Sequence, residues 1–413
     1  MKLKHYSHDV WIVIFLAVVM SLSAVAILSQ DGRVPAHPMN QAFVTTADLR
    51  IGQHSGVWYF HYPHLQWAGG ITGSLAVGVY KLIIPTTPEH LNHHIKILAM
   101  VLFFLFSYLL ANQYLKTRLG LALFIAIVAT SGLQLIEPTN DLIAATYLLA
   151  FLYGMAKRWN FIITTLLLVC FGLCKAELPT VAGAMMLYWA WVTPDKKNKA
   201  LIMGGFVFWA AVFLAPGLYL YGVKTIAGGR SFCSFSNHYT LLMAKYKLIT
   251  LPGNPDFSQI IGREFPGAKS LPDIIAGWPQ KYFVYVLVCA LTNLLIFIRT
   301  FKGIFGVLVL RWARCREKIA SNHFEPMVLI GFIALAIPHT LVAAFRARYL
   351  LKFFAPFVLI SVVYWEYCRE RSDKPAYLWQ ARIILALLIL TIALQLAGLM
   401  RIIENPCFLE FIG

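Results

Sequence analysis

The stretch DGRVPAHPMNQAFVTTADLRIGQHSGVWYFHYPHLQW, residues 31–67, is a long polar segment in a chain that is otherwise strongly apolar. An apolar run over about residues 10–29 precedes it, and another follows at about 97–115. An apolar run of about 20 residues is long enough to cross a bilayer as a helix. The stretch therefore predicts a helical membrane protein with a large polar loop after its first span.

The composition supports a membrane protein. Of the 413 residues 59% are hydrophobic and only 13% are charged, whereas soluble domains carry about 25% charged residues. The net charge of +17 has two ordinary explanations, which are basic cytoplasmic loops and cations elsewhere that would bind an anionic lipid. No basic soluble domain is present, so we expect no nucleic-acid partner. The seven cysteines include no CxxC, so we expect no disulfide framework.

The positions of Lys and Arg between the apolar runs predict the topology of one integral membrane domain, residues 1–413. Basic residues precede the first run and follow the run at 97–115, so the loop 30–96 is expected outside. A second long external loop is expected at 223–282 and a basic cytoplasmic loop at 299–325. About eleven spans result, near residues 10–29, 97–115, 120–136, 142–156, 161–174, 180–193, 201–222, 283–298, 327–344, 349–366 and 383–400.

Two further apolar segments are expected to lie at the membrane surface. Residues 69–85, GGITGSLAVGVYKLIIP, are short and Gly-rich, and a span here would place Lys116 and Arg118 outside. We interpret them as a juxtamembrane or re-entrant segment of the first external loop. Residues 303–318, GIFGVLVLRWARCREK, are typical of an interfacial amphipathic helix within the cytoplasmic loop.

This topology gathers ionisable side chains at the outer ends of the spans. Ionisable groups at membrane depth are costly, so they are functional candidates by default. For any single residue, the alternative is that a helix end simply reaches water. The residues concerned are Asp31, Asp48, Glu137, Asp141, Lys175, Glu177, His339, Arg346 and Arg348.

In the order of these features the chain resembles the GT-C superfamily of polyprenyl-phosphate-dependent glycosyltransferases, which includes protein O-mannosyltransferases and lipid A aminoarabinose transferases. The resemblance covers roughly residues 10–365 and is architectural. The matching segments are WYFHYPHLQW after the acid Asp48, LIEPTNDLIAATYLLAFLYG with Glu137 and Asp141, CFGLCKAELPTVAGAMML with Lys175, and RARYLLKFFAPFVLI with Arg348 and Tyr349.

The chain departs from the family pattern at two points. Lys352 stands near a position where proline is common, and the first-loop acid lacks the frequent Asp-Glu pair. The missing pair leaves the catalytic base open between Asp48, the leading candidate, and Asp31. Asp48 can instead favour the start of a helix capped by the preceding threonines. Asp141 is a third catalytic candidate, or only a cap of the helix that follows it.

The resemblance implies an all-α, GT-C-like fold and transfer of a sugar from a polyprenyl-phosphate donor to an acceptor hydroxyl, with inversion at the anomeric carbon. A carboxylate would act as general base, and cations would stabilise the departing phosphate. Lys175, Arg346 and Arg348 are the expected donor-phosphate ligands. The expected substrate-binding residues are His61, Tyr62, His64, Glu137, Glu177 and Tyr349.

The sequence leaves the acceptor open among a glycan, lipid A and a protein. We expect the bacterial cytoplasmic (inner) membrane as the location, with the active site on the periplasmic, external face. No cofactor is expected. The histidines of HYPH (61–64) and HLNHH (90–94) only weakly suggest a divalent metal, because no carboxylate stands at ligand spacing.

Two other functions are compatible with the same chain. An O-antigen-type polysaccharide polymerase or ligase also has many spans, long external loops and functional arginines. A lipid or solute transporter usually places polar groups near the bilayer midplane, whereas the spans predicted here are almost uncharged at their centres. We therefore rank transport last.

Overall fold

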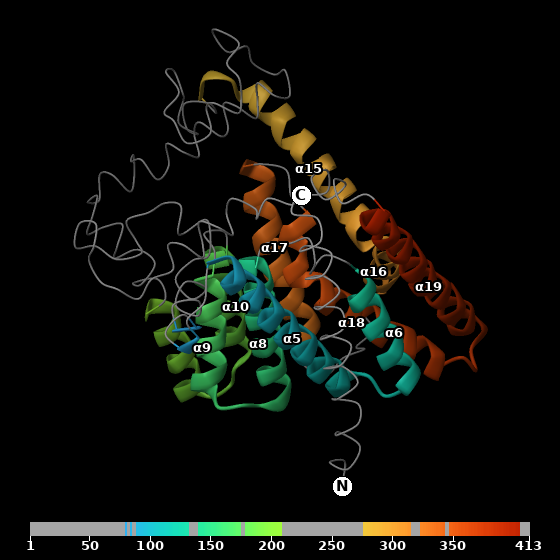
Figure 1. Cartoon of the computed structure of the whole chain (residues 1–413), viewed down its shortest axis with the longest axis horizontal. Coiled ribbons are helices and arrows are strands. Elements are labelled where there is room, and N and C mark those ends of the chain that lie inside the picture. The colour runs from blue at the N-terminus through green and yellow to red at the C-terminus, as the bar shows by residue number, and fades with distance from the viewer. Residues whose placement is uncertain are drawn as a thin grey trace.

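The computed structural model describes residues 79–80, 83–84, 88–131, 139–174, 178–208, 276–314, 323–342 and 347–404. These residues fold into helices, and no strand occurs among them (Figure 1). The labelled helices are α5 (Pro88–Tyr114), α6 (Arg118–Thr130), α8 (Thr139–Lys157), α9 (Phe161–Gly172), α10 (Leu178–Val192), α15 (Pro279–Phe301), α16 (Gly303–Ala313), α17 (Phe324–Val342), α18 (Ala347–Glu370) and α19 (Pro375–Glu404). Residues 196–208 are helical as well.

Five helices in the described part of the chain are long and apolar enough to cross a membrane. They include Ile97–Tyr114 of α5, all of α15, Phe324–Leu341 of α17, Tyr349–Glu370 of α18 and Pro375–Gly398 of α19. The described part of the chain is thus all-helical and has the character of a membrane protein. The total of eleven spans stays a prediction, because the run 10–29, most of 201–222 and nearly all of both long external loops lie outside the described residues.

The observed helices extend beyond several of the apolar runs. α5 starts at Pro88 rather than near residue 97, and α19 starts at Pro375 rather than near 383. Proline suits the first turn of a helix, because its fixed φ is helical and its missing N–H has no partner there. Hydropathy detects only the apolar part of such a helix, so the polar first turns were not predicted.

Helix α18 is the centre of the bundle. The structure buries 89% of its span, and it contacts α5, α6, α8, α15, α16, α17 and α19. Phe353, Phe354 and Phe357 of this helix are fully buried, and it also buries the charged side chains of Lys352 and Glu366. Neighbouring helices therefore cover both its apolar and its charged positions. By contrast, α15, α17 and α19 bury only 22–29% of their spans and expose leucine and isoleucine side chains that suit contact with lipid.

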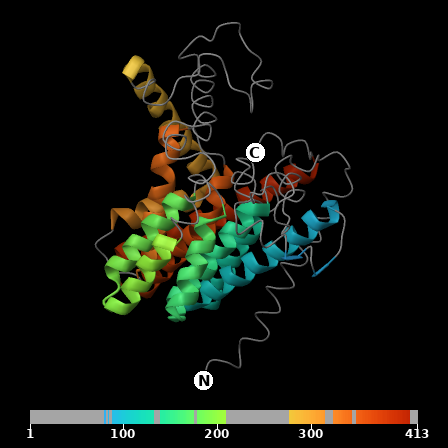
Figure 2. The same ribbon diagram turned by 90° about the vertical axis from the view of Figure 1, so that its left-hand side faces the viewer.

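The remaining helices pack around α18 in two groups. On one side α5 packs on α8, α8 on α9 and α9 on α10 (Figures 1 and 2). On the other side α16 lies against α18 and α19. α16 is the helix expected within residues 303–318, and its buried residues Ile304, Val307 and Leu308 show that one face packs in the bundle. Its position relative to a membrane stays a prediction.

Helix termini meet at two opposite ends of the bundle. The pair end, named for Asp141 and Lys352, holds the starts of α8 and α18 and the last turns of α17. The pocket end, named for the cavity beside Arg158, holds the ends of α5, α8 and α10 and the starts of α9 and α17. The predicted topology places the pair end outside and the pocket end in the cytoplasm.

Candidate functional site

The pair end contains a fully buried ion pair between two neighbouring helices. Asp141 lies in the first turn of α8, and Lys352 lies in the second turn of α18. The Nζ of Lys352 donates to Oδ1 of Asp141 over 2.6 Å, and both side chains have 0% of their surface exposed. The pair therefore ties the start of α8 to the start of the central helix.

Two features of the local sequence favour this arrangement. The first turn of a helix carries partial positive charge, which stabilises the Asp141 carboxylate. In α18, Pro356 stands four residues after Lys352 and has no N–H to donate to the Lys352 carbonyl. The ion pair thus lies beside the turn at which α18 loses one helical hydrogen bond.

Two aromatic side chains extend the pair into a cluster. The Nζ of Lys352 lies 5.5 Å from the ring centroid of Tyr349, within the range of a cation–π contact. The Tyr349 ring lies 4.7 Å from the ring of His339 in α17. We call Asp141, Lys352, Tyr349 and His339 the pair cluster. His339 Nδ1 is 3.0 Å from the Leu335 carbonyl, which requires a proton on Nδ1 because a carbonyl can only accept.

The geometry of the pair bears on what Asp141 can do. A general base must come within hydrogen-bond reach of the proton that it removes. Oδ1 of Asp141 is engaged by Lys352 and the side chain has no contact with solvent. This arrangement suits an anchor more directly than a base. The catalytic role predicted for Asp141 stays a prediction.

Most of the predicted site residues lie outside the described residues. The structure brings together Asp141, Tyr349 and His339, while Arg348 is described only as the second residue of α18. The predicted site residues that lie outside the described residues are Asp31, Asp48, His61, Tyr62, His64, Glu137, Lys175, Glu177 and Arg346.

Sequence reasoning noted Lys352 only as a departure from a family pattern and gave it no role. A signal was present: Lys352 stands in the otherwise apolar segment LLKFFAPF, and Asp141 stands at the edge of another apolar run. Charges of opposite sign in two membrane helices tend to pair with each other. Hydropathy does not show which helices are neighbours, so the partner was not identified.

A cavity and a metal centre are the other features expected of a site. A cavity of about 390 Å³ lies at the pocket end, and no residue of the pair cluster lines it. Among the described residues, no three His, Cys, Asp or Glu side chains come together to hold a metal ion. Dependence on a divalent metal stays untested.

Comparison with known proteins gives no assignment. No known protein family, curated protein or solved structure matches the chain. Its function is therefore argued from its own residues.

Proposed function

We propose that this protein is a membrane glycosyltransferase that moves a sugar from a polyprenyl phosphate to an acceptor hydroxyl on the outer face of the bacterial cytoplasmic membrane. The observation that supports this most is the buried Asp141–Lys352 pair. Its lysine lies in the second turn of α18, one helical turn after Arg348 and Tyr349, which belong to the predicted donor-binding segment.

The proposal gives the pair a positioning role. Arg348 stands four residues before Lys352, which is about one helical turn away. An ion pair that fixes Lys352 also fixes the backbone from which Arg348 extends. Electrostatic stabilisation of a leaving group depends on such preorganisation, because a cation that is already in place needs no rearrangement during the reaction.

In the proposed reaction the acceptor hydroxyl loses its proton to a first-loop carboxylate, Asp48 or alternatively Asp31. The acceptor oxygen forms a bond to the anomeric carbon as the bond from that carbon to the phosphate oxygen breaks. The electron pair of the broken bond stays on the phosphate, and Lys175, Arg346 and Arg348 offset its added charge. Single displacement inverts the anomeric configuration.

The depth of the pair favours surface chemistry over transport. Asp141 lies roughly 3 Å and Lys352 roughly 7.5 Å along their helices from the first residue, at 1.5 Å per residue. Both are therefore near one end of the bundle. A transporter usually places its polar groups near the bilayer midplane, at broken helices.

The test is single-turnover transfer by the purified full-length protein, with radiolabelled polyprenyl-phosphate sugars and a cell-envelope extract as the acceptor. Asp48→Asn should abolish transfer, and Arg348→Gln should slow it by about 10²-fold or more, as expected for the loss of one group that stabilises transition-state charge. Lys374→Gln is the matched control, because Lys374 is an exposed cation in the turn between α18 and α19 and should leave the rate unchanged.

Three outcomes separate the alternatives. If Asp48→Asn keeps full activity, the base is to be sought at Asp31 or Asp141. A ladder of products, rather than addition of one sugar, would assign the protein to the polymerases. If the wild type consumes no donor even with extract, the glycosyltransferase proposal is wrong.

A further inference from the structure

The cavity at the pocket end has the size and lining of a ligand site. Its volume of about 390 Å³ falls in the range of about 300–1,000 Å³ that is usual for small-molecule pockets. Five helix termini form it, and Arg158 and His323 are its basic residues, while no acidic residue lines it. The ends of three helices and the starts of two meet here, so the helix dipoles largely offset one another. The positive charge therefore comes from side chains.

The walls of the cavity are aromatic. Phe161 and Trp189 stack almost in parallel, with 5.3 Å between ring centroids and 12° between planes. On the opposite side Tyr114 packs on Phe324 at 4.7 Å. The lining hydroxyl of Thr193 donates to the carbonyl of Trp189 and is therefore committed within its own helix. Polar recognition is left mainly to the two basic residues.

Arg158 occupies a backbone position at which glycine is usual. After α8 the Trp159 N–H donates to the Gly154 carbonyl over 2.9 Å, and the Arg158 N–H donates to the Met155 carbonyl over 3.2 Å. These two bonds form the Schellman motif of helix termination. In this motif the residue at the position of Arg158 has a left-handed conformation and is most often glycine. Arg158 has a φ of 55°. This left-handed conformation is energetically unfavourable for any residue other than glycine.

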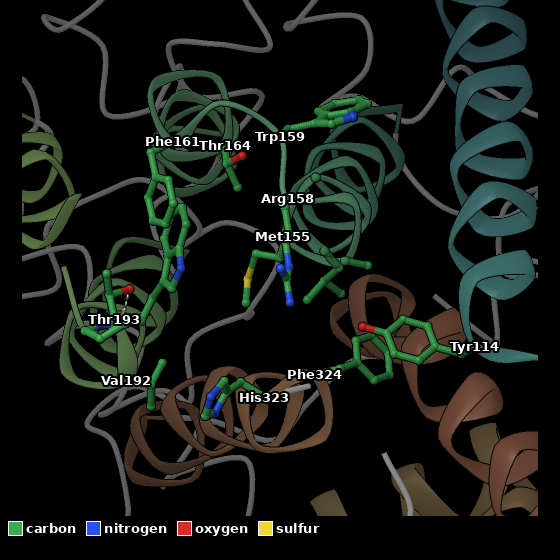
Figure 3. Close-up of a pocket in the computed structure, with 15 residues that line it drawn as sticks. Tyr114, Met155, Arg158, Trp159, Phe161, Thr164, Val192, Thr193, His323 and Phe324 are labelled. Carbon is green, nitrogen blue, oxygen red and sulfur yellow. Dashed lines mark hydrogen bonds between the residues drawn. The ribbon is translucent and has the colours of Figure 1, made fainter. Parts of the chain in front are cut away.

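The side chain of Arg158 points into the cavity. Figure 3 shows it directed between Met155 and the side of the pocket formed by His323 and Phe324. Within the described ranges, no residue pairs or hydrogen-bonds with its guanidinium. His323 is held on one side, because its Nδ1 lies 3.2 Å from the Tyr188 hydroxyl. A strained residue that presents an unpaired cation to a cavity suggests a function for that cation.

We propose that this pocket binds a phosphate group, free or carried by an amphiphilic molecule. The planar guanidinium of Arg158 matches two phosphate oxygens at once, with His323 beside it. The Phe161–Trp189 wall takes the apolar or ring-shaped part of the ligand. Either a lipid headgroup or a free phosphate supplies this chemistry. The site lies at the opposite end of the bundle from the pair cluster and does not depend on the proposed glycosyl transfer.

The experiment is isothermal titration of the purified full-length protein in an uncharged detergent. The three probes are dihexanoyl phosphatidic acid below its micelle concentration, the neutral dihexanoylglycerol, and inorganic phosphate. Saturable binding of the phosphatidic acid with weak binding of phosphate identifies a lipid headgroup as the ligand. Equal binding of both identifies a free phosphate. Absence of binding by both, or equal binding of the neutral lipid, overturns the proposal.

Three variants show whether Arg158 carries the binding. Arg158→Gly keeps the left-handed turn and removes the cation, so binding should weaken by about tenfold or more, as for loss of a charge-assisted hydrogen bond. Arg158→Lys should retain part of the affinity. Lys157→Ala removes an exposed neighbouring charge that does not line the cavity and should change nothing. If Arg158→Gly melts no lower than the wild type and binds equally well, Arg158 only terminates the helix and the site is not the one proposed.

Discussion

The two ends of the bundle place their cations in opposite ways. At the pair end, Lys352 is fully buried and its charge is offset by Asp141 at 2.6 Å. At the pocket end, Arg158 is exposed and its side chain faces a cavity. A buried ion without a partner is very costly, so the buried cation must be paired. A cation available to a ligand must instead lie where solvent reaches it.

The other buried charges in the described part of the chain follow the rule of the pair end. Arg311 of α16 donates to Glu325 of α17 over 2.8 Å, and their side chains are only 6% and 14% exposed. Glu366 of α18, 4% exposed, accepts the backbone N–H groups of Lys116 and Thr117, each at 2.9 Å. These buried charged side chains thus connect one helix to another. Arg158 makes no such connection to any described residue.

The largest expected effect comes from breaking the buried pair. Lys352→Met leaves Asp141 as an uncompensated buried charge and should lower the free energy of unfolding by about 3–5 kcal/mol. Asp141→Leu combined with Lys352→Met removes both charges and should recover most of that loss, because an apolar replacement of a buried pair is often close to neutral. Thermal unfolding in detergent measures both variants.

The control for this prediction is the exposed pair of Lys116 and Glu370, whose side chains are 67% and 44% exposed. Lys116→Met should cost at most about 1 kcal/mol. The double variant also tests catalysis. If it is stable but transfers no sugar even at long times, Asp141 acts in the chemistry rather than as an anchor, and the positioning role proposed for the pair is wrong.

A medium effect is expected where Glu366 meets the start of α6. Gly120 faces this carboxylate so closely that a Cβ would collide with Oε1 of Glu366. Gly120→Ala should therefore lower stability by about 1–3 kcal/mol, as for overpacking of a filled interior. Gly204 is the matched control, because it is also helical and nothing lies within 4 Å of its Cβ position.

Gly204→Ala should raise stability by up to about 1 kcal/mol, since alanine is the better helix former. Opposite signs at the two glycines would show that the buried carboxylate limits the space at Gly120. If Gly120→Ala is also stabilising, Glu366 is not confined by the start of α6 as described.

The sequence predicted the helical character of the described segments because apolar runs of this length have few other structures available to them in a membrane. It also identified Asp141 as an unusual acid at a helix end. It did not predict the Asp141–Lys352 contact, since the two residues are 211 positions apart and nothing in a hydropathy pattern gives helix neighbours. The cavity was missed for the same reason, because segments as far apart in sequence as Tyr114 and Phe324 form it.

The smallest effect is the one that separates the two ends most directly. Arg158→Gly relieves a left-handed conformation that costs roughly 1–2 kcal/mol for a residue with a side chain. Glycine also loses more backbone freedom on folding, which offsets roughly 0.5–1 kcal/mol of that gain. The free energy of unfolding should therefore stay unchanged or rise slightly, by up to about 1.5 kcal/mol.

Lys302 supplies the control for the backbone part of this argument. Among the described residues other than glycine, only Arg158 and Lys302 have a positive φ, and that of Lys302 is 52°. Lys302 lies between α15 and α16 rather than at the cavity. Lys302→Gly should shift thermal unfolding in the same direction as Arg158→Gly without changing phosphate binding. A cation whose removal stabilises the protein and weakens ligand binding serves the ligand, whereas Lys352, whose removal destabilises it, serves the fold. If Arg158→Gly instead lowers stability as Lys352→Met does, the contrast between the two ends fails.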